Sequence, residues 1–200
     1  MKTYERMKIL LSKFFIRLFR IKFTGVENIP TDRAVIVCPN HLSNWDPFLI
    51  AAITDVKIHF MAKKQLFKVP IVRSFVTSLG AFPVNRGSAD PSALKTAIKL
   101  LKDGGSVGVF PQGTRHGGED PENTQIKSGI GMIAYRSGAD VVPVAIKTKN
   151  YKIKPFRRVY INVGKPIPNS SLGLDGASAE GYTRASETVF SEIIRLGKEI

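Results

Sequence analysis

Residues 34–53 read AVIVCPNHLSNWDPFLIAAI and combine, in this order, an apolar run, a polar turn and the start of a helix. The run at 34–38 is rich in β-branched residues, which predicts a buried strand. Asp46 suits the helix N-cap and Pro47 the first helical position, so we expect a helix over 46–53. Strand-like and helix-like segments go on alternating along the chain, and this alternation predicts an α/β sandwich with a mixed central sheet flanked by helices.

The other elements follow from hydrophobic periodicity and from the positions of Gly and Pro. We expect strands near 22–27, 34–38, 57–61, 81–85, 106–110, 141–147 and 158–163. We expect helices near 46–53, 64–78, 90–102, 127–137 and 179–198. Open α/β sheets hold their functional sites at strand ends, so the residues that follow strands 34–38 and 106–110 are the candidate site residues.

The composition indicates a single domain. The 200 residues are 43% hydrophobic, which is enough for one core, and neither repeats nor a low-complexity linker indicates a second domain. The one cysteine, Cys38, cannot form an internal disulfide, and we expect it to be a small buried strand residue rather than a nucleophile. Since no signal peptide is evident, we expect a reducing, cytoplasmic setting.

The net charge indicates an anionic partner. The formal charge of +14 is more than solubility needs, and it implies nucleic acid, a membrane face or phosphorylated substrates. No nucleic-acid-binding motif stands out, and charge without such a motif is weak support, so we expect no nucleic-acid partner. His59 and His116 are isolated from other metal ligands, so we expect no metal site.

Residues 1–22 are predicted to form a basic amphipathic helix, which precedes the domain at 23–200. On a helical projection, one side collects Met7, Leu10, Leu11, Phe14, Phe15, Leu18 and Ile21, and a neighbouring face collects Arg6, Lys13, Arg17 and Arg20. No apolar run is long enough to span a bilayer, so this helix would lie in the membrane interface with its cations toward anionic headgroups. The alternative is a terminal helix folded onto the core of the domain, and periodicity alone does not separate the two.

His41 and Asp46 are the leading candidates for catalysis. They are too far apart in sequence for one face of a helix, where neighbours are three or four residues apart, but they can meet across a turn that leads into a helix. The carboxylate would then fix the ring tautomer and stabilise the imidazolium as His41 takes a proton from a hydroxyl. The alternative is a histidine in a polar loop beside a capping aspartate.

A second segment, residues 110–115, reads FPQGTR and follows another strand-like run. The Asn-His-x-x-x-x-Asp motif followed by Phe-Pro-x-Gly-Thr-Arg resembles the glycerolipid acyltransferase family, specifically its PlsC-like 1-acylglycerol-3-phosphate acyltransferases. Two weaker blocks, GAFPVNRG at 80–87 and VVPV at 141–144, fall in the order of the family. The resemblance covers about residues 24–165, nearly all of the compact part of the chain.

This resemblance implies an acyltransferase domain with His41 as general base and Asp46 as the residue that orients it. The implied reaction transfers a fatty acyl group from a coenzyme A or acyl carrier protein thioester to lysophosphatidic acid, giving phosphatidic acid, and it needs no cofactor. It implies a peripheral enzyme on the cytoplasmic face of an anionic membrane. Glycerol-3-phosphate or another lysolipid is the alternative acceptor. The alternative of another class is a non-catalytic module that binds anionic lipid or nucleic acid, which leaves the ordered motifs unexplained.

The resemblance also implies a phosphate site. Arg115 would grip the acceptor phosphate through its planar fork, and Lys63 would add a second, mobile charge. Arg86 would be a third cation, although a surface charge after an edge strand explains it equally well. Gly113 and Thr114 would let the backbone approach the acceptor or the oxyanion closely.

One residue departs from the family pattern, which usually reads Phe-Pro-Glu-Gly-Thr-Arg. This chain has Gln112 in place of the Glu, whose family role is contact with the glycerol portion of the acceptor. A glutamine still forms hydrogen bonds with hydroxyls but brings no negative charge beside a phosphate. We therefore interpret Gln112 as a residue that tunes the choice of acceptor and leaves the enzyme active.

Overall fold

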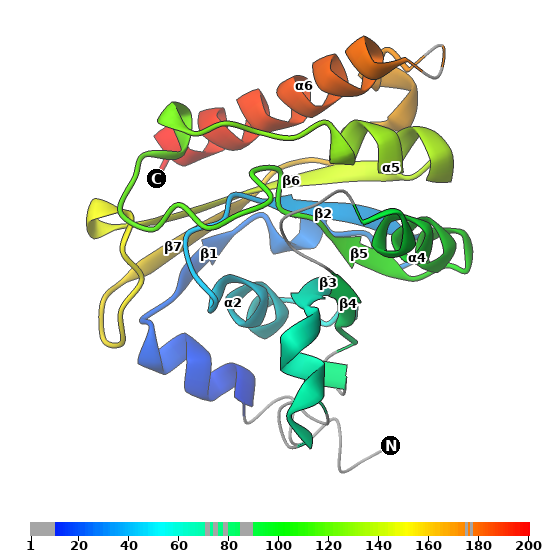
Figure 1. Cartoon of the computed structure of the whole chain (residues 1–200). Helices are drawn as coiled ribbons and strands as arrows, with labels where there is room; N and C mark the ends of the chain where they lie inside the picture. The colour runs from blue at the N-terminus through cyan, green and yellow to red at the C-terminus, as the bar shows by residue number, and fades with distance from the viewer. Residues whose placement is uncertain are drawn as a thin grey trace.

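The computed structural model describes residues 11–70, 73, 76–77, 80–84, 90–174, 176 and 178–200. Within these residues seven strands form one sheet in the order β1-β7-β6-β2-β5-β3-β4. β6 and β7 are antiparallel, and the other neighbouring pairs are parallel. Helices cover both faces of this sheet (Figure 1), so the predicted α/β sandwich with a mixed sheet is confirmed.

The observed elements follow the predicted order. The strands are β1 (Lys22–Thr24), β2 (Val35–Pro39), β3 (Ile58–Lys63), β4 (Phe82–Val84), β5 (Ser106–Gly108), β6 (Asp140–Thr148) and β7 (Val159–Val163). The labelled α-helices are α2 (Asp46–Ile53), α4 (Pro91–Lys102), α5 (Gly129–Ser137) and α6 (Ala179–Lys198), and the N-terminal helix is helical over 11–18. Each predicted strand is present, and α2 and α6 have the predicted bounds.

Two elements differ from the prediction. Residues Lys64–Lys68 form a 3-10 helix instead of the first turns of an α-helix over 64–78. Pro70 disfavours an α-helix that continues through it from residue 64, because proline lacks an N–H group and clashes with the preceding turn. Proline suits the first helical position, and the described residues 70, 73, 76 and 77 are helical, so the later part of the prediction is confirmed. β1 is shorter than predicted because Gly25 turns the chain at a φ of 71°, where an added Cβ would lie 2.1 Å from the carbonyl oxygen of Val163.

The sheet separates two hydrophobic cores. On one face, Ile36 and Cys38 of β2 pack with apolar residues of α4, α5 and α6. On the other, Val35 and Val37 pack with apolar residues of α2 and of the N-terminal helix. Cys38 is fully buried, as predicted, and burial raises the pKa of its thiol well above the usual value. The thiol therefore stays neutral and unreactive in the native state.

The N-terminal helix lies against the face of the sheet that α2 covers (Figure 1), and residues 1–10 of the predicted 1–22 helix lie outside the described residues. Three of its side chains pack against the second core: Phe15, Ile16 and Leu18. Phe14 is 56% exposed, and Lys13 and Arg17 are exposed beside it. The domain thus covers part of the predicted apolar face. No helix in the described part of the chain has the length and apolar character that crossing a bilayer requires.

Candidate active site

The two motif segments meet at one edge of the sheet. β2 and β5 are parallel neighbours, with Ile36 opposite Val107 and Val37 opposite Gly108. Their carboxyl ends therefore point the same way, and the loop after β2 lies beside the loop after β5. One backbone bond joins these loops, from the N–H of His116 to the carbonyl oxygen of His41 at 2.8 Å. The prediction that both motifs lie at strand ends is confirmed.

His41 and Asp46 form a buried pair. Nδ1 of the imidazole lies 2.8 Å from Oδ2 of the carboxylate, and the two side chains are 3% and 0% exposed. The same oxygen accepts hydrogen bonds from the backbone N–H of Leu42 at 2.7 Å and of Ser43 at 2.8 Å. Asp46 thus organises the loop that carries His41. The helix N-cap is Trp45, not Asp46 as predicted, because the carboxylate turns back onto this loop.

The surroundings of Asp46 set its protonation and the tautomer of His41. Burial raises the pKa of the Asp46 carboxyl, and the hydrogen bonds from His41, Ser43 and Leu42 oppose that rise by favouring the ionised form. A carboxylate that accepts a hydrogen bond from Nδ1–H directs the basic lone pair of the imidazole to Nε2. The pair therefore has the arrangement of a general base and its orienting acid.

An aromatic contact, which the sequence pattern did not reveal, fixes the plane of the His41 ring. Phe110 stacks on the imidazole with ring centroids 3.8 Å apart and an interplanar angle of 18°. Phe60 from β3 stacks on the far side of the cluster, 5.7 Å from Phe110. Phe110 is the first residue of the FPQGTR segment, so its position directly after an apolar strand was the available signal. The stack and the Asp46 bond together restrict rotation of the ring.

Gln112 is 2% exposed, and both ends of its amide are engaged inside the protein. Oε1 accepts a hydrogen bond from the backbone N–H of His41 at 2.6 Å. Nε2 donates to Oγ1 of Thr124 at 2.8 Å, and Thr124 donates in turn to the carbonyl oxygen of Pro121. Gln112 thus connects the two motif loops and holds the main chain of His41. Its predicted contact with the acceptor stays a prediction.

The predicted phosphate ligands lie on the same edge but are more exposed. Lys63 ends β3, the other neighbour of β5, and its side chain is exposed. Thr114 and Arg115 are exposed on the loop after β5. Gly113 has a φ of 67°, and an added Cβ there would lie 3.0 Å from Cδ of Lys127. Arg86 lies outside the described residues.

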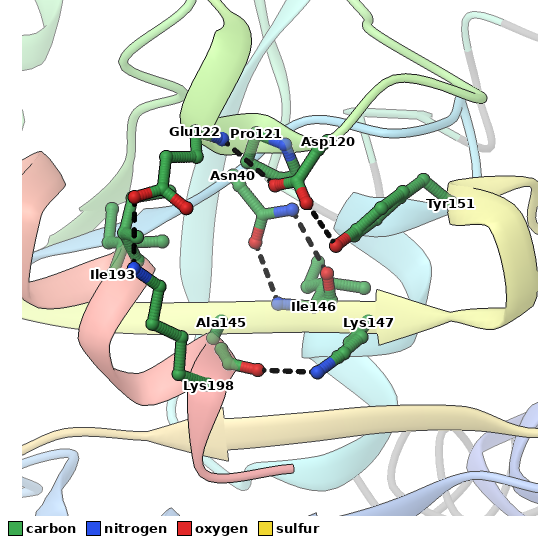
Figure 2. Close-up of a pocket in the computed structure, with 12 residues that line it drawn as sticks. Asn40, Asp120, Pro121, Glu122, Ala145, Ile146, Lys147, Tyr151, Ile193 and Lys198 are labelled. Carbon is green, nitrogen blue, oxygen red and sulfur yellow. Dashed lines mark hydrogen bonds and ion pairs between the residues drawn. The ribbon is translucent and has the colours of Figure 1, made fainter.

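The rest of the loop after β5, residues 116–125, is bound to the segment that follows β6 and to α6. The N–H of Gly118 donates to the carbonyl oxygen of Tyr151 at 2.9 Å, and the Tyr151 hydroxyl donates to Asp120 at 2.6 Å. Lys198 of α6 pairs with Glu122 at 2.9 Å (Figure 2). The hydrogen bond from Tyr151 lowers the pKa of Asp120, and the pKa of Tyr151 rises to about 12. These contacts hold the loop in place beside the His41–Asp46 pair.

Asn40, the residue before His41, joins the loop after β2 to β6. Its side chain donates to the carbonyl oxygen of Ile146 at 3.0 Å and accepts from the N–H of Ile146 at 2.7 Å. Figure 2 shows these two hydrogen bonds beside a cavity of about 70 Å³ between the loop after β5, β6 and the end of α6. The cavity is too small for a lipid. Asn40 thus braces the motif loop.

The other histidines have local partners. Nδ1 of His59 lies 2.8 Å from the carbonyl oxygen of Gly80, and Nδ1 of His116 lies 2.8 Å from Glu119. Within the described residues, no three His, Cys, Asp or Glu side chains gather in a way that could hold a metal ion.

Comparisons with known proteins place both motif loops in one family pattern. The family model described as Acyltransferase matches residues 20–147. The 1-acyl-sn-glycerol-3-phosphate acyltransferase of Bacillus subtilis is 35% identical over 151 residues, which cover 74% of this chain and 73% of the relative. The enzyme of the same name from Streptococcus pneumoniae is 31% identical over 98% of this chain and 73% of its own length. The crystal structure of the 1-acyl-sn-glycerophosphate (LPA) acyltransferase PlsC from Thermotoga maritima aligns with a TM-score of 0.74 and 29% identity, covering 99% of this chain and 81% of that chain.

Proposed function

Because the chain belongs to the Acyltransferase family, we propose that it transfers a fatty acyl group from a thioester to the free hydroxyl of 1-acyl-glycerol-3-phosphate, giving phosphatidic acid. The observation that carries this proposal is the buried His41–Asp46 pair at the edge where the two motif loops meet. A module that only binds lipid or nucleic acid has no need of this pair.

The reaction follows from the geometry of the pair. Nε2 of His41 takes the proton of the acceptor hydroxyl as that oxygen attacks the thioester carbonyl. A C–O bond forms, the C–S bond breaks, and His41 returns the proton to the departing thiolate. Asp46 stabilises the imidazolium in between, and general acid–base catalysis of this kind contributes about 10²- to 10⁴-fold. No acyl-enzyme is needed, so Ser43 has no nucleophilic role.

The acceptor phosphate would bind to the exposed cations on the same edge. Arg115 meets two phosphate oxygens through its fork, and Lys63 adds a point charge from the end of β3. Arg86 is a third candidate for this phosphate. The backbone at Gly113 and Thr114 would approach the oxyanion, since the absence of a side chain at Gly113 leaves the main chain accessible.

Gln112 would act mainly through His41. Its carbonyl oxygen accepts from the His41 main chain at 2.6 Å, so it fixes the backbone that carries the base. The neutral amide supplies a donor to Thr124, which a carboxylate at this position could not do. This role differs from direct contact with the acceptor, and steady-state kinetics of a Gln112→Leu variant, with the acceptor varied, separate the two.

The membrane is the proposed place of reaction, with the N-terminal helix on an anionic surface. Phe15 and Phe19 lie 5.9 and 5.5 Å from the ring of Trp45, the residue before Asp46. The helix is therefore packed against the loop that holds the catalytic pair. Phe14 and the exposed cations Lys13 and Arg17 remain for contact with lipid. An enzyme held in this way meets a lipid acceptor where that acceptor is dissolved.

A thioester-release assay across a panel of acceptors tests the proposed function. Purified enzyme is given acyl-coenzyme A or acyl-acyl carrier protein with lysophosphatidic acid, glycerol-3-phosphate or a zwitterionic lysolipid, each dispersed in detergent. We expect release with lysophosphatidic acid to exceed release with the others, and phosphatidic acid to be the product. Faster release with glycerol-3-phosphate would assign the enzyme to the other acceptor class, and no release with any acceptor would contradict catalysis.

A further inference from the structure

The loop between β6 and β7, residues 149–158, combines positive charge with one exposed aromatic ring. It reads KNYKIKPFRR, and the chain has no Asp or Glu between positions 141 and 174. Phe156 is 74% exposed, the highest value among the large apolar side chains that the structure describes. The cations exposed on the same loop are Lys149, Lys152, Lys154 and Arg158.

Phe156 is held in a backbone conformation that does not suit it. Its φ of 63° lies in the left-handed region, which Gly and Asn adopt readily and bulky residues avoid. The guanidinium of Arg157 maintains the loop by donating to the carbonyl oxygens of Lys149 and Lys152 at 3.1 and 3.2 Å. The Phe156 ring belongs to neither hydrophobic core. Folding alone would favour Gly or Asn here, so the exposed ring calls for a partner outside the domain.

Hydrogen bonds tie this loop to the end of the N-terminal helix. The N–H of Phe156 donates to the carbonyl oxygen of Leu18 at 2.6 Å, and the N–H of Val159 donates to that of Phe19 at 3.1 Å. Figure 1 shows the loop and the helix side by side, extending from the same side of the sheet. The two segments are thus neighbours, and each carries exposed cations and one exposed phenylalanine, Phe14 or Phe156.

We propose that the β6–β7 loop is a second membrane-contacting element, which inserts the Phe156 ring into an anionic bilayer while its lysines meet lipid phosphates. This inference rests on the proposed function, in which the N-terminal helix lies on the membrane. A bilayer accepts a single ring without a fitted pocket, and its headgroups supply the complementary charge. An acidic protein partner would normally offer a pocket for several clustered contacts, and here the ring is alone. A single helix can roll on the membrane surface. Contact through both the helix and the neighbouring loop fixes the orientation of the enzyme.

Phe156→Asn tests the role of the ring without harming the fold. Asparagine tolerates the left-handed conformation, so the melting temperature should be equal to or above that of the parent. Binding to sedimenting vesicles of mixed phosphatidylglycerol and phosphatidylcholine should weaken about tenfold or more, since burial of a Phe side chain supplies an effect of this size. Phe156→Leu keeps an apolar side chain at the same strained position and should retain most of the binding.

The charge contribution is tested with a matched control. Lys152→Gln with Lys154→Gln should weaken binding about fivefold for each charge at low salt, and less as salt rises. Lys95→Gln with Lys102→Gln removes two exposed charges from α4, which packs near β4 and β5 at the other end of the sheet (Figure 1), and should have little effect.

The outcomes separate this inference from the proposed function. Loss of vesicle binding in Phe156→Asn, with parental turnover of detergent-dispersed lysophosphatidic acid, supports the loop as a membrane contact. Parental vesicle binding by both Phe156→Asn and the double lysine variant overturns it, and so does a parent chain that does not bind these vesicles. A raised KM for acyl-acyl carrier protein with unchanged vesicle binding also overturns it, because the loop would then serve an acidic donor protein. Turnover of the detergent-dispersed acceptor by the parent tests the proposed function independently in every case.

Discussion

Replacing Gln112 with leucine separates a bracing role from contact with the acceptor. Leucine has an apolar side chain of similar size to glutamine, but it leaves the buried N–H of His41 without its acceptor. Such a group costs about 1–3 kcal/mol, while Thr124 keeps its bond to Pro121. For a domain of this size each kcal/mol lowers the melting temperature by roughly 2–4 °C, so we expect a loss of several degrees. We also expect kcat to fall more than tenfold, because the base would no longer be held in position.

Thermal unfolding and steady-state kinetics with the acceptor varied measure both effects. Gln112→Glu is the matched control, because a carboxylate oxygen still accepts from His41 N–H and the family pattern carries glutamate at this position. It should retain most of the stability and turnover. The bracing role would be refuted if Gln112→Leu raised only the KM for the acceptor and left kcat and melting temperature unchanged, since that result indicates direct contact with substrate.

Three further changes test other parts of the account. Arg115→Ala should raise the KM for lysophosphatidic acid at least tenfold with little change in the KM for the thioester. Arg115→Lys should rescue poorly because the planar guanidinium is lost. Equal acceptor KM values in mutant and parent would remove Arg115 from the phosphate site. Phe14→Glu should weaken binding to anionic vesicles without lowering the melting temperature, since the ring is 56% exposed, whereas unchanged binding would assign the helix to the domain alone. Tyr151→Phe should destabilise the protein at pH 7. This difference should shrink as pH falls below the usual Asp range, because the pKa of Asp120 is lowered in the fold and the contribution of its carboxylate is lost on protonation. A pH-independent difference would refute the hydrogen bond to Asp120 as its cause.

Hydrophobic periodicity and the positions of Gly and Pro were enough to predict the sheet and the helices that pack on it. The helix predicted over 64–78 was wrong only in its first part, where residues 64–68 form a 3-10 helix; Pro70 suits a helix start and indicates the later beginning. The short β1 depended on the close approach of Gly25 to Val163, a contact between strands far apart in sequence. Local sequence carries no direct signal for such tertiary contacts.

The His41–Asp46 pair was predictable because its two members are five residues apart, at the two ends of one short turn. The residues that position it were not predictable, because they come from another segment, the loop after β5. From this loop Phe110 stacks on His41, and Gln112 accepts a hydrogen bond from the His41 backbone. The sequence showed that Phe110 and Gln112 belong to the motif, but it did not show that their side chains contact His41. The N-terminal helix shows the same limit, since periodicity predicted an apolar face and only the structure revealed that Phe15 and Leu18 pack against the core.

The central claim is that His41 is the base for acyl transfer, and turnover of a folded His41→Ala protein tests it most directly. Thioester release and phosphatidic acid formation are measured with saturating lysophosphatidic acid, and the melting temperature checks the fold. Asp46→Asn serves as a second variant, which should also be severely impaired because an amide can leave the ring in the wrong tautomer. We predict that His41→Ala loses at least about 10²-fold in kcat, in keeping with general base catalysis. A folded His41→Ala protein with more than about half of the parental rate would contradict the account.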